Sequence, residues 1–405
     1  MILTKYKLGE ILDVTRGASL SGEYYATEGE YIRLTCGNFD YQNNCFKENK
    51  SKDNLYYVGD FKSEFLMEEG DIITPLTEQA IGLLGSTAII PESGKYIQSQ
   101  DVAKIICKED LLDKDFAFYL ISSALVKQQL SAAAQQTKIR HTSPDKIKDC
   151  TVWIPELSEQ KRIGKLLRSI DRKIELNRAI NQNLEAMAKQ LYDYWFVQFD
   201  FPNEEGKPYK SSGGEMVWNE KLKRKIPNEW DNCKLKDFIN LFDSKRIPLS
   251  SKDREERKGN YPYYGATGIM DYVNEYIFDG DYILLAEDGS TSDSKGFPIV
   301  QYIWGKNWVN NHAHIILPKN EQYLMFTYQM LRSIPAKQIE TGSIQKKISQ
   351  ENLCEYNMVL PNSILIEKYE SIISPLWEKR KLCIEEINAL IKQRDELLPL
   401  LMNGQ

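Results

Sequence analysis

The fold is decided by the stretch SEQKRIGKLLRSIDRKIELNRAINQNLEAMAKQLYDYWF, Ser158 to Phe196. Apolar and amide side chains recur in it every seven residues, and a second such row follows four positions behind the first. Two rows at this spacing over about five heptads predict one long helix with a coiled-coil seam. At about 1.5 Å per residue, this helix would be about 60 Å long. The rows are Ile163, Ile170, Asn177, Leu184 and Leu191, and Leu167, Ile174, Asn181, Ala188 and Trp195.

The two ends of this helix have their own signals. Ser158 is the predicted N-cap, with Glu159 in the first turn, where negative charge suits the helix dipole. The far end carries an aromatic cluster that covers more of the helix circumference than one helical partner can bury. We expect the excess to pack against the next globular unit and a partner subunit, and the alternative is a core within the chain. The cluster is Tyr192, Tyr194, Trp195, Phe196 and Phe199.

A second helix is predicted from about residue 364 to the end of the sequence. Pro375 should kink it or split off its first turns. Two helices in one chain most simply pair antiparallel, and the alternative is that each packs on its own domain. The predicted seam is Tyr369, Leu376, Cys383, Leu390 and Leu397, with Ile373, Ile387 and Leu401 alongside.

The chain contains an internal repeat, because four similarities occur in the same order in each half. In the last pair Ser143 aligns with Ser349 and Pro155 with Pro361, and each proline precedes a long helix. The order is therefore globular unit, helix, globular unit, helix, with a pseudo-twofold relation. The pairs are YKLGEIL with CKLKDFI, EEGDIITPL with FDGDYILLA, DKDFAFYLISSALVKQQL with NEQYLMFTYQMLRSI, and KIRHTSPDKIKDCTVWIP with IQKKISQENLCEYNMVLP.

The globular units are predicted to be α/β or α+β. Short β-rich runs such as DVAKIIC, YILLA and AHIILP lie between Gly, Asn, Asp and Pro turn signals. The predicted boundaries are 1–155 and 233–361 for the two units, 156–200 and 362–405 for the two helices, and 201–232 for a linker.

Length and composition limit the class of protein. At 405 residues the chain is too long for one core. It has no run of about 18 apolar residues that could span a membrane, and its start lacks signal-peptide features. Seven scattered cysteines without a CxxC pair favour reduced thiols and the cytoplasm. The net charge of −6 does not favour nucleic-acid binding, but residues 131–175 hold ten Lys and Arg against six Asp and Glu.

Motifs of several enzyme classes are absent from the sequence. It has no GxxxxGK[ST] loop, no glycine-rich cofactor loop after a strand, and no Asn-Pro-Pro-aromatic or Asp-Pro-Pro-aromatic tetrapeptide of an amino-methyltransferase. His312 and His314 alternate along a predicted strand, and Glu287 and Asp288 could complete a metal site with them. The first half has no such pair, so we predict no metal site and no catalytic residue. A metal-dependent nuclease using this region is an alternative.

The loops of both halves are rich in side chains that hydrogen-bond bases and phosphates. Each is commonly a solvated loop residue, but QQTKIRHTS and GSIQKKIS place amides and cations before both helices. We therefore predict a DNA-contacting set in each half. The first is Arg16, Thr35, Asn38, Tyr41, Gln42, Asn43, Thr77, Glu78, Gln79, Gln98, Gln100, Lys138, Arg140 and His141. The second is Lys245, Arg246, Ser250, Lys252, Arg254, Arg257, Tyr263, Tyr264, Asn310, Asn311, His312, Gln345, Lys346 and Lys347.

Two long segments are distinctive: the helix with its flanks, IPELSEQKRIGKLLRSIDRKIELNRAINQNLEAMAKQLYDYWFVQFDF, and KPYKSSGGEMVWNEKLKRKIPNEW after it. Shorter ones in the second half are YPYYGATGIMDYV, EDG, NNHAHII and TGSIQKKIS. Together they resemble the specificity (S) subunit of type I restriction–modification systems, over nearly the whole chain.

The resemblance implies two target-recognition domains that each recognise half of a split DNA sequence, and an antiparallel coiled coil that sets the spacer. The helices would dock two methyltransferase (modification) subunits, and restriction subunits would join them for host defence. S-adenosylmethionine, ATP and Mg are expected on those partners, and no cofactor on this chain. The implied coiled-coil and partner residues are Ile163, Ile170, Asn177, Leu184, Leu191, Trp195, Phe196, Ile373, Leu376, Ile387, Leu390 and Leu397.

The two halves differ in detail. From Lys7 to Pro155 is 148 positions, whereas from Lys234 to Pro361 is 127, which suits an asymmetric target. A coiled-coil scaffold that binds only proteins is the second alternative, and it would show no sequence-dependent DNA binding.

Overall fold

The computed structural model describes residues 2–78, 82–133, 140–342 and 346–402. Gln79, Lys138 and Gln345 of the predicted DNA-contacting sets therefore lie outside the described residues. The chain divides into two units, which we call unit 1 (Met1–Asn177 and Glu385–Gln405) and unit 2 (Arg178–Ile384). Among the residues described, none of the helices combines the length and apolar character needed to cross a membrane.

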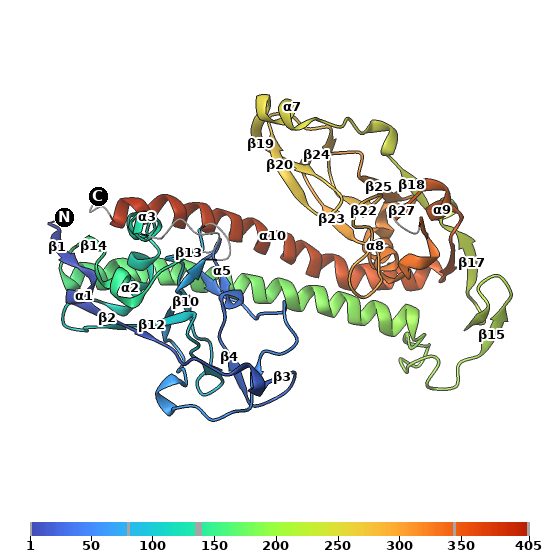
Figure 1. Cartoon of the computed structure of the whole chain (residues 1–405). Coiled ribbons are helices and arrows are strands. Elements are labelled where there is room, and N and C mark those ends of the chain that lie inside the picture. The colour runs from blue at the N-terminus through green and yellow to red at the C-terminus, as the bar shows by residue number, and fades with distance from the viewer. Residues whose placement is uncertain (1, 79–81, 134–139, 343–345, 403–405) are drawn as a thin grey trace. The chain divides into compact units, whose positions relative to one another are not determined.

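A four-stranded antiparallel sheet in the order β10-β8-β12-β2 forms the centre of unit 1 (Figure 1). Successive side chains of a strand point to opposite faces, so this sheet has two apolar faces. Ile72 and Ala103 face a core shared with helices, whereas their neighbours Ile73 and Val102 face a second core. The strands are β2 (Leu12–Arg16), β8 (Ile72–Pro75), β10 (Ala88–Ile89) and β12 (Val102–Cys107).

The rest of unit 1 covers these two faces. Helices α2 (Lys114–Ile121) and α3 (Ala124–Ala133) pack on the first face, and a smaller sheet in the order β11-β4-β7-β3 contributes to the second core. The other elements are β1 (Thr4–Lys7), α1 (Leu8–Ile11), β3 (Tyr25–Ala26), β4 (Tyr31–Arg33), β5 (Phe39–Asp40), β6 (Cys45–Phe46), β7 (Tyr56–Tyr57), β9 (Thr77–Glu78), β11 (Tyr96–Ile97), β13 (Arg140–His141), α4 (Pro144–Lys148) and β14 (Thr151–Ile154).

The same topology recurs in unit 2. Its main sheet has the order β23-β22-β25-β18, strand for strand the counterpart of β10-β8-β12-β2. The pairing of a first with a last strand, β1 with β14, recurs as β17 (Asp231–Lys234) with β28 (Asn357–Leu360). The prediction of two similar mixed α/β units is therefore confirmed. The main strands are β18 (Ile239–Leu241), β22 (Tyr282–Ala286), β23 (Val300–Ile303) and β25 (Ala313–Pro318).

The remaining elements of unit 2 include an additional hairpin, β15 (Met216–Asn219) with β16 (Arg224–Pro227). They also include a second four-stranded sheet in the order β20-β19-β24-β21. The others are α6 (Leu235–Phe238), α7 (Ser251–Glu256), β19 (Lys258–Tyr264), β20 (Ile269–Val273), β21 (Phe278–Asp279), β24 (Lys306–Val309), α8 (Leu324–Ser333), β26 (Glu340–Thr341), β27 (Lys347–Ile348) and α9 (Gln350–Glu355).

Two long helices, α5 (Leu157–Tyr192) and α10 (Ser363–Met402), each contribute one half to each unit. In unit 1, Ile170 and Ile174 of α5 pack against Ile387 of α10, and Asn177 donates to Glu386 Oε2 at 2.7 Å. In unit 2, the Tyr369 hydroxyl donates to the Ala188 carbonyl oxygen at 3.1 Å. Residue numbers rise along α5 as they fall along α10, so the helices pair antiparallel as predicted.

The predicted seam residues divide by depth. The first five seam positions of α5 are buried, and the half-buried positions lie mainly toward the end of each helix. The buried ones are Ile163, Leu167, Ile170, Ile174, Asn177, Ala188, Trp195, Tyr369, Ile373, Cys383 and Ile387, and the half-buried ones are Asn181, Leu184, Leu191, Leu376, Leu390, Leu397 and Leu401.

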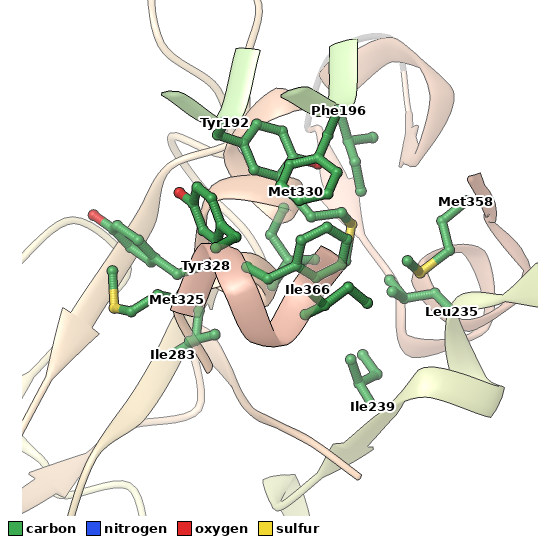
Figure 2. Packing of buried hydrophobic residues seen from close by; sticks show 14 of the residues in the cluster. Tyr192, Phe196, Leu235, Ile239, Ile283, Met325, Tyr328, Met330, Met358 and Ile366 are labelled. Atoms are coloured by element: carbon green, nitrogen blue, oxygen red, sulfur yellow. The ribbon is translucent and has the colours of Figure 1, made fainter. Parts of the chain in front are cut away.

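The aromatic end of α5 is buried within the chain. A π-helical turn, Asp193–Val197, follows Tyr192, and its wider turn brings Trp195 and Phe196 into one core. Figure 2 shows Tyr192 and Phe196 beside Met330 of α8. Phe199 joins the same cluster, and Tyr194 stays 38% exposed. The four buried rings therefore fill the chain's own core, and Tyr194 is the member that a partner could contact.

The predicted N-cap of α5 and the predicted splitting of α10 at Pro375 are wrong. Helix α5 begins at Leu157, one residue before the predicted cap Ser158, because the Glu156 carbonyl already accepts from the Glu159 and Gln160 amides. Helix α10 continues through Pro375 without a break. Pro375 lies on the exposed side, where water can reach the Ser371 carbonyl that loses its partner, while the opposite side stays buried.

Candidate nucleic-acid interface

In unit 1, the loop after β8 meets the start of β12 and strand β13. The Leu76 amide donates to the Asp101 carbonyl oxygen at 2.8 Å, and the Thr142 amide donates to the Leu76 carbonyl oxygen at 2.9 Å. β9 pairs with β13, which places Thr77 opposite His141. The Thr77 hydroxyl lies 3.3 Å from both Asp101 Oδ1 and His141 Nδ1. These contacts bring Thr77, Asp101 and His141 together at an end of the main sheet, and we call these three residues cluster 1.

Unit 2 builds the same junction with other side chains. The Glu287 amide donates to the His312 carbonyl oxygen at 2.8 Å, and the Ile348 amide donates to the Glu287 carbonyl oxygen at 2.8 Å. Asp288 forms an isolated backbone β-bridge with Lys347, and Asp288 Oδ1 lies 2.6 Å from His312 Nδ1. The repeated bonds make Leu76 the counterpart of Glu287, Asp101 of His312, and Thr142 of Ile348. Ser143 and Ser349, which the sequence repeat aligns, follow directly. We call Asp288, His312 and Lys347, the counterparts of Thr77, Asp101 and His141, cluster 2.

The counterpart relation extends to neighbouring residues. Gln100 precedes Asp101 as Asn311 precedes His312, and both amides are exposed. Arg140 and Lys346 occupy matching positions and are both cationic. Each cluster therefore presents an amide and a cation at equivalent backbone positions, the side chains that bind base edges and phosphates.

The other predicted residues of unit 1 have varied surroundings. Arg16 is exposed, and its Nε donates to the Gln100 carbonyl oxygen at 2.8 Å, so it borders cluster 1. The loop 35–43 reaches the cluster at its start, where the Cys36 thiol donates to the Thr77 carbonyl oxygen at 3.3 Å. Exposed or half-buried are Arg16, Thr35, Tyr41, Gln42, Asn43, Gln100, Arg140 and His141, and buried are Asn38, Thr77, Glu78 and Gln98.

Some of these residues hold their loops in shape. Gln98 Nε2 donates to the Thr15 carbonyl oxygen at 2.9 Å and to the Val102 carbonyl oxygen at 3.1 Å. Asn38 Oδ1 accepts from the Thr35 amide at 2.9 Å. Their polar groups are engaged inside the unit, so their contribution in this structure is to loop geometry.

The predicted residues of unit 2 divide in the same way. Arg254 Nη1 donates to the Leu249 carbonyl oxygen at 2.8 Å, and the Tyr263 hydroxyl accepts from the Leu249 amide at 3.0 Å. Exposed are Lys245, Ser250, Lys252, Arg257, Asn311, His312, Lys346 and Lys347, half-buried are Arg246, Arg254 and Tyr264, and buried are Tyr263 and Asn310.

The four side chains considered for a metal site do not converge. His312 bonds Asp288, whereas His314 points into the unit, with Nδ1 2.6 Å from Asp243 Oδ2 and Nε2 2.8 Å from the Ile348 carbonyl oxygen. Within the described residues, Asp243, Glu287 and His314 are close enough to ligate one ion. Both nitrogens of His314 are already engaged with oxygen atoms of the chain, however.

A cation of the chain occupies this space instead. Arg246 Nη1 donates to Glu287 Oε2 at 2.8 Å, and Arg246 Nη2 lies 3.4 Å from Asp243 Oδ2. Burial by itself raises the pKa of Asp243, but hydrogen bonds from His314 and the Ile315 amide bring that pKa below its usual value. Burial also acts to raise the pKa of Glu287, but the hydrogen bond from Arg246 helps to bring that pKa below its usual value. This ion network holds Glu287, the residue directly before Asp288 of cluster 2, in place.

Sequence inspection missed Asp101 and Asp243. Asp101 could have been found by aligning the apolar pattern of DVAKIIC with that of HAHIILP, because this alignment pairs Asp101 with His312. Asp243 lies in LFDSKR, which has no counterpart in the recognised repeats, so nothing in the sequence indicated its contact with His314.

The family model described as type I restriction modification DNA specificity domain matches residues 3–186 and 227–386. The type I restriction enzyme MjaIX specificity subunit of Methanocaldococcus jannaschii is 23% identical over 327 residues, covering 76% of this chain and 72% of that protein. A putative specificity subunit, S.HindORF215P of Haemophilus influenzae, is 34% identical over 142 residues, 35% of each chain.

A solved structure shares the fold. The S subunit of a type I restriction–modification system from M. genitalium superposes with a TM-score of 0.62 at 18% identity, over 98% of this chain and 96% of that one. The family model covers far more than half of the chain and includes both polar clusters. The chain belongs to the family of type I restriction–modification DNA specificity domains.

Proposed function

We propose that this chain is a specificity subunit that recognises a bipartite, asymmetric DNA target, one half with each unit. The recognition domains are assigned to residues 1–155 and 233–361. The main support for the proposal is that the two clusters occupy equivalent backbone positions but consist of different side chains. Thr77, Asp101 and His141 in unit 1 occupy the backbone positions of Asp288, His312 and Lys347 in unit 2. Equal placement with different donors and acceptors is what recognition of two different half-sites requires.

The proposed contacts follow from exposure. Gln100 and Asn311 have exposed amides, which pair with adenine edges in the major groove. Arg140, Lys346 and Lys347 would bind phosphates and set the register on the duplex. The antiparallel helices α5 and α10 would fix the spacer between the half-sites.

The helices also offer a basis for partner docking. Three exposed apolar pairs recur at the same offset of 206 residues: Leu166 with Ile372, Leu176 with Leu382, and Tyr194 with Leu400. Apolar side chains left exposed at matching positions support two copies of one partner binding in equivalent ways. We assign these surfaces to two modification subunits, with restriction subunits joining that complex.

The chemistry is assigned to those partners. The chain itself is proposed to be non-catalytic, and S-adenosylmethionine, ATP and Mg would bind the modification and restriction subunits. A subunit that recognises chromosomal DNA works where the chromosome is, so the cytoplasm is the expected location.

The test is binding-site selection from a randomised duplex library, with the full chain and its co-purified partner subunits. The selected sequence should contain two defined halves and an unspecified spacer. Gln100→Ala should relax one half only, and Asn311→Ala the other half only. Selection of no sequence at all would instead support the protein-binding scaffold, and relaxation of both halves by each variant would refute the division between units.

A further inference from the structure

The β19–β20 hairpin of unit 2 carries an exposed apolar patch. Ile269 is 47%, Met270 55% and Tyr272 49% exposed, and all three lie on β20. Single exposed apolar side chains are ordinary, but three on one five-residue strand favour a contact surface. None of these three residues belongs to cluster 1 or to cluster 2.

The hairpin turn is held rigidly. The Gly265 amide donates to the Gly268 carbonyl oxygen at 2.8 Å. From β23, Gln301 Nε2 donates to the carbonyl oxygens of Gly265 at 3.0 Å and Ala266 at 2.9 Å. Met270 packs so close over Gly265 that a Cβ on that glycine would lie 2.5 Å from the Met270 sulfur. The turn and the Met270 side chain are therefore positioned by contacts within the unit.

One buried side chain joins this hairpin to cluster 2. Asn310 is 3% exposed; its amide donates to the Tyr264 carbonyl oxygen at 3.0 Å and its Nδ2 lies 3.3 Å from Met270 Sδ. Its Oδ1 accepts from the His312 amide at 2.8 Å. The apolar patch and the exposed Asn311–His312 loop therefore share Asn310 as a common neighbour.

DNA offers one apolar group on the base edges of its major groove, the 5-methyl group of thymine. A thioether and a branched alkyl chain suit that group, because methionine is polarizable and adapts its shape. We propose that Met270 and Ile269 recognise thymine methyl groups in the half-site bound by unit 2. This inference rests on the proposed function and adds a contact that hydrogen-bonding residues cannot supply.

The experiment uses the full chain with its co-purified partner subunits and its selected duplex. Each thymine of the unit 2 half-site is replaced in turn by deoxyuridine, which lacks only the methyl group. We expect one or two replacements to weaken binding by about fourfold each, the factor for one buried methyl group. Met270→Gln and Ile269→Ser should bind the thymine duplex less tightly and lose the discrimination between thymine and deoxyuridine.

The controls separate this inference from the proposed function. Val58→Ser removes an equally exposed apolar side chain from unit 1 and should keep the full discrimination. Sequence-specific binding with no effect of deoxyuridine, or with the same effect in the Met270 and Ile269 variants, would overturn this inference alone. A unit 2 half-site without thymine on either strand would also overturn it. Absence of any sequence-specific binding would refute both proposals.

Discussion

Glu370 on α10 should make the stability of unit 2 depend on pH. Its Oε1 accepts from the Phe326 amide near the start of α8 at 2.7 Å, and its Oε2 accepts from the Ser374 hydroxyl at 3.1 Å. The carboxyl group is buried, which raises its pKa to about 7 from 4.5, although these hydrogen bonds act in the opposite direction. In unit 1 the corresponding amide, that of Phe116, is instead capped by Asp113 at 3.0 Å.

The sign and size of the effect follow from linkage. Because the folded pKa is raised, the stabilising effect of the proton is complete below about pH 4.5 and is lost as pH rises to about 7. Between pH 5 and 8 this loss amounts to about 2.5 kcal/mol for one group with these two pKa values. Glu370→Gln keeps an acceptor for the Phe326 amide and cannot ionise. The variant should therefore lack this part of the pH dependence.

The assay is urea unfolding of wild type and variant at several pH values between 5 and 8, followed by tryptophan fluorescence. Six of the seven tryptophans lie in unit 2, so the signal reports that unit. Glu367→Gln changes an exposed carboxylate one turn earlier on α10 and serves as the matched control. A stability difference between Glu370→Gln and wild type that stays constant within about 0.5 kcal/mol from pH 5 to 8 would refute the reasoning.

Three further predictions concern the helices. Arg394→Met leaves Asp171 buried without its cation and should cost unit 1 roughly 3–5 kcal/mol in thermal or chemical unfolding; an unaffected variant would contradict this. Adding Asp171→Leu should restore only part of the loss, because the buried Tyr119 hydroxyl then lacks its acceptor. Inserting seven residues after Asn177 and seven after residue 384 lengthens both helices by about 10 Å and keeps the seam in phase, so the spacer in selected DNA should grow by about three base pairs, and an unchanged spacer would exclude the ruler role. Leu176→Ser with Leu382→Ser should weaken co-purification of modification subunits without lowering the unfolding midpoint, whereas full retention of partners would place docking elsewhere.

Local patterns in the sequence predicted most of the fold. YILLA and AHIILP coincide with β22 and β25, and the heptad rows coincide with the buried sides of α5 and α10. These succeed because period-two and period-seven apolar patterns report burial directly. The repeat predicted the two-unit organisation for the same reason, since duplicated strands keep their apolar positions.

Features set by tertiary contacts were not predictable. Ser122 and Ser123 divide the predicted helical stretch into α2 and α3, and the Ser122 hydroxyl bonds the Phe118 carbonyl oxygen at 3.1 Å. Pro375 is tolerated because it faces water, which the sequence does not reveal. In the candidate site, the amides and cations were predictable as residue types, but the contacts of Thr77 with Asp101 and His141 depend on the pairing of β9 with β13, which the sequence does not reveal.

The central claim is that each unit determines one half of a split DNA target. The most direct measurement is sequencing of methylated bases in the host genome, with wild-type chain, with Asn311→Ala and without the chain. We expect one bipartite methylated motif with a fixed spacer, which disappears without the chain and loses definition in one half only with Asn311→Ala. Methylation that persists unchanged without the chain, or both halves changing together in the variant, would contradict it.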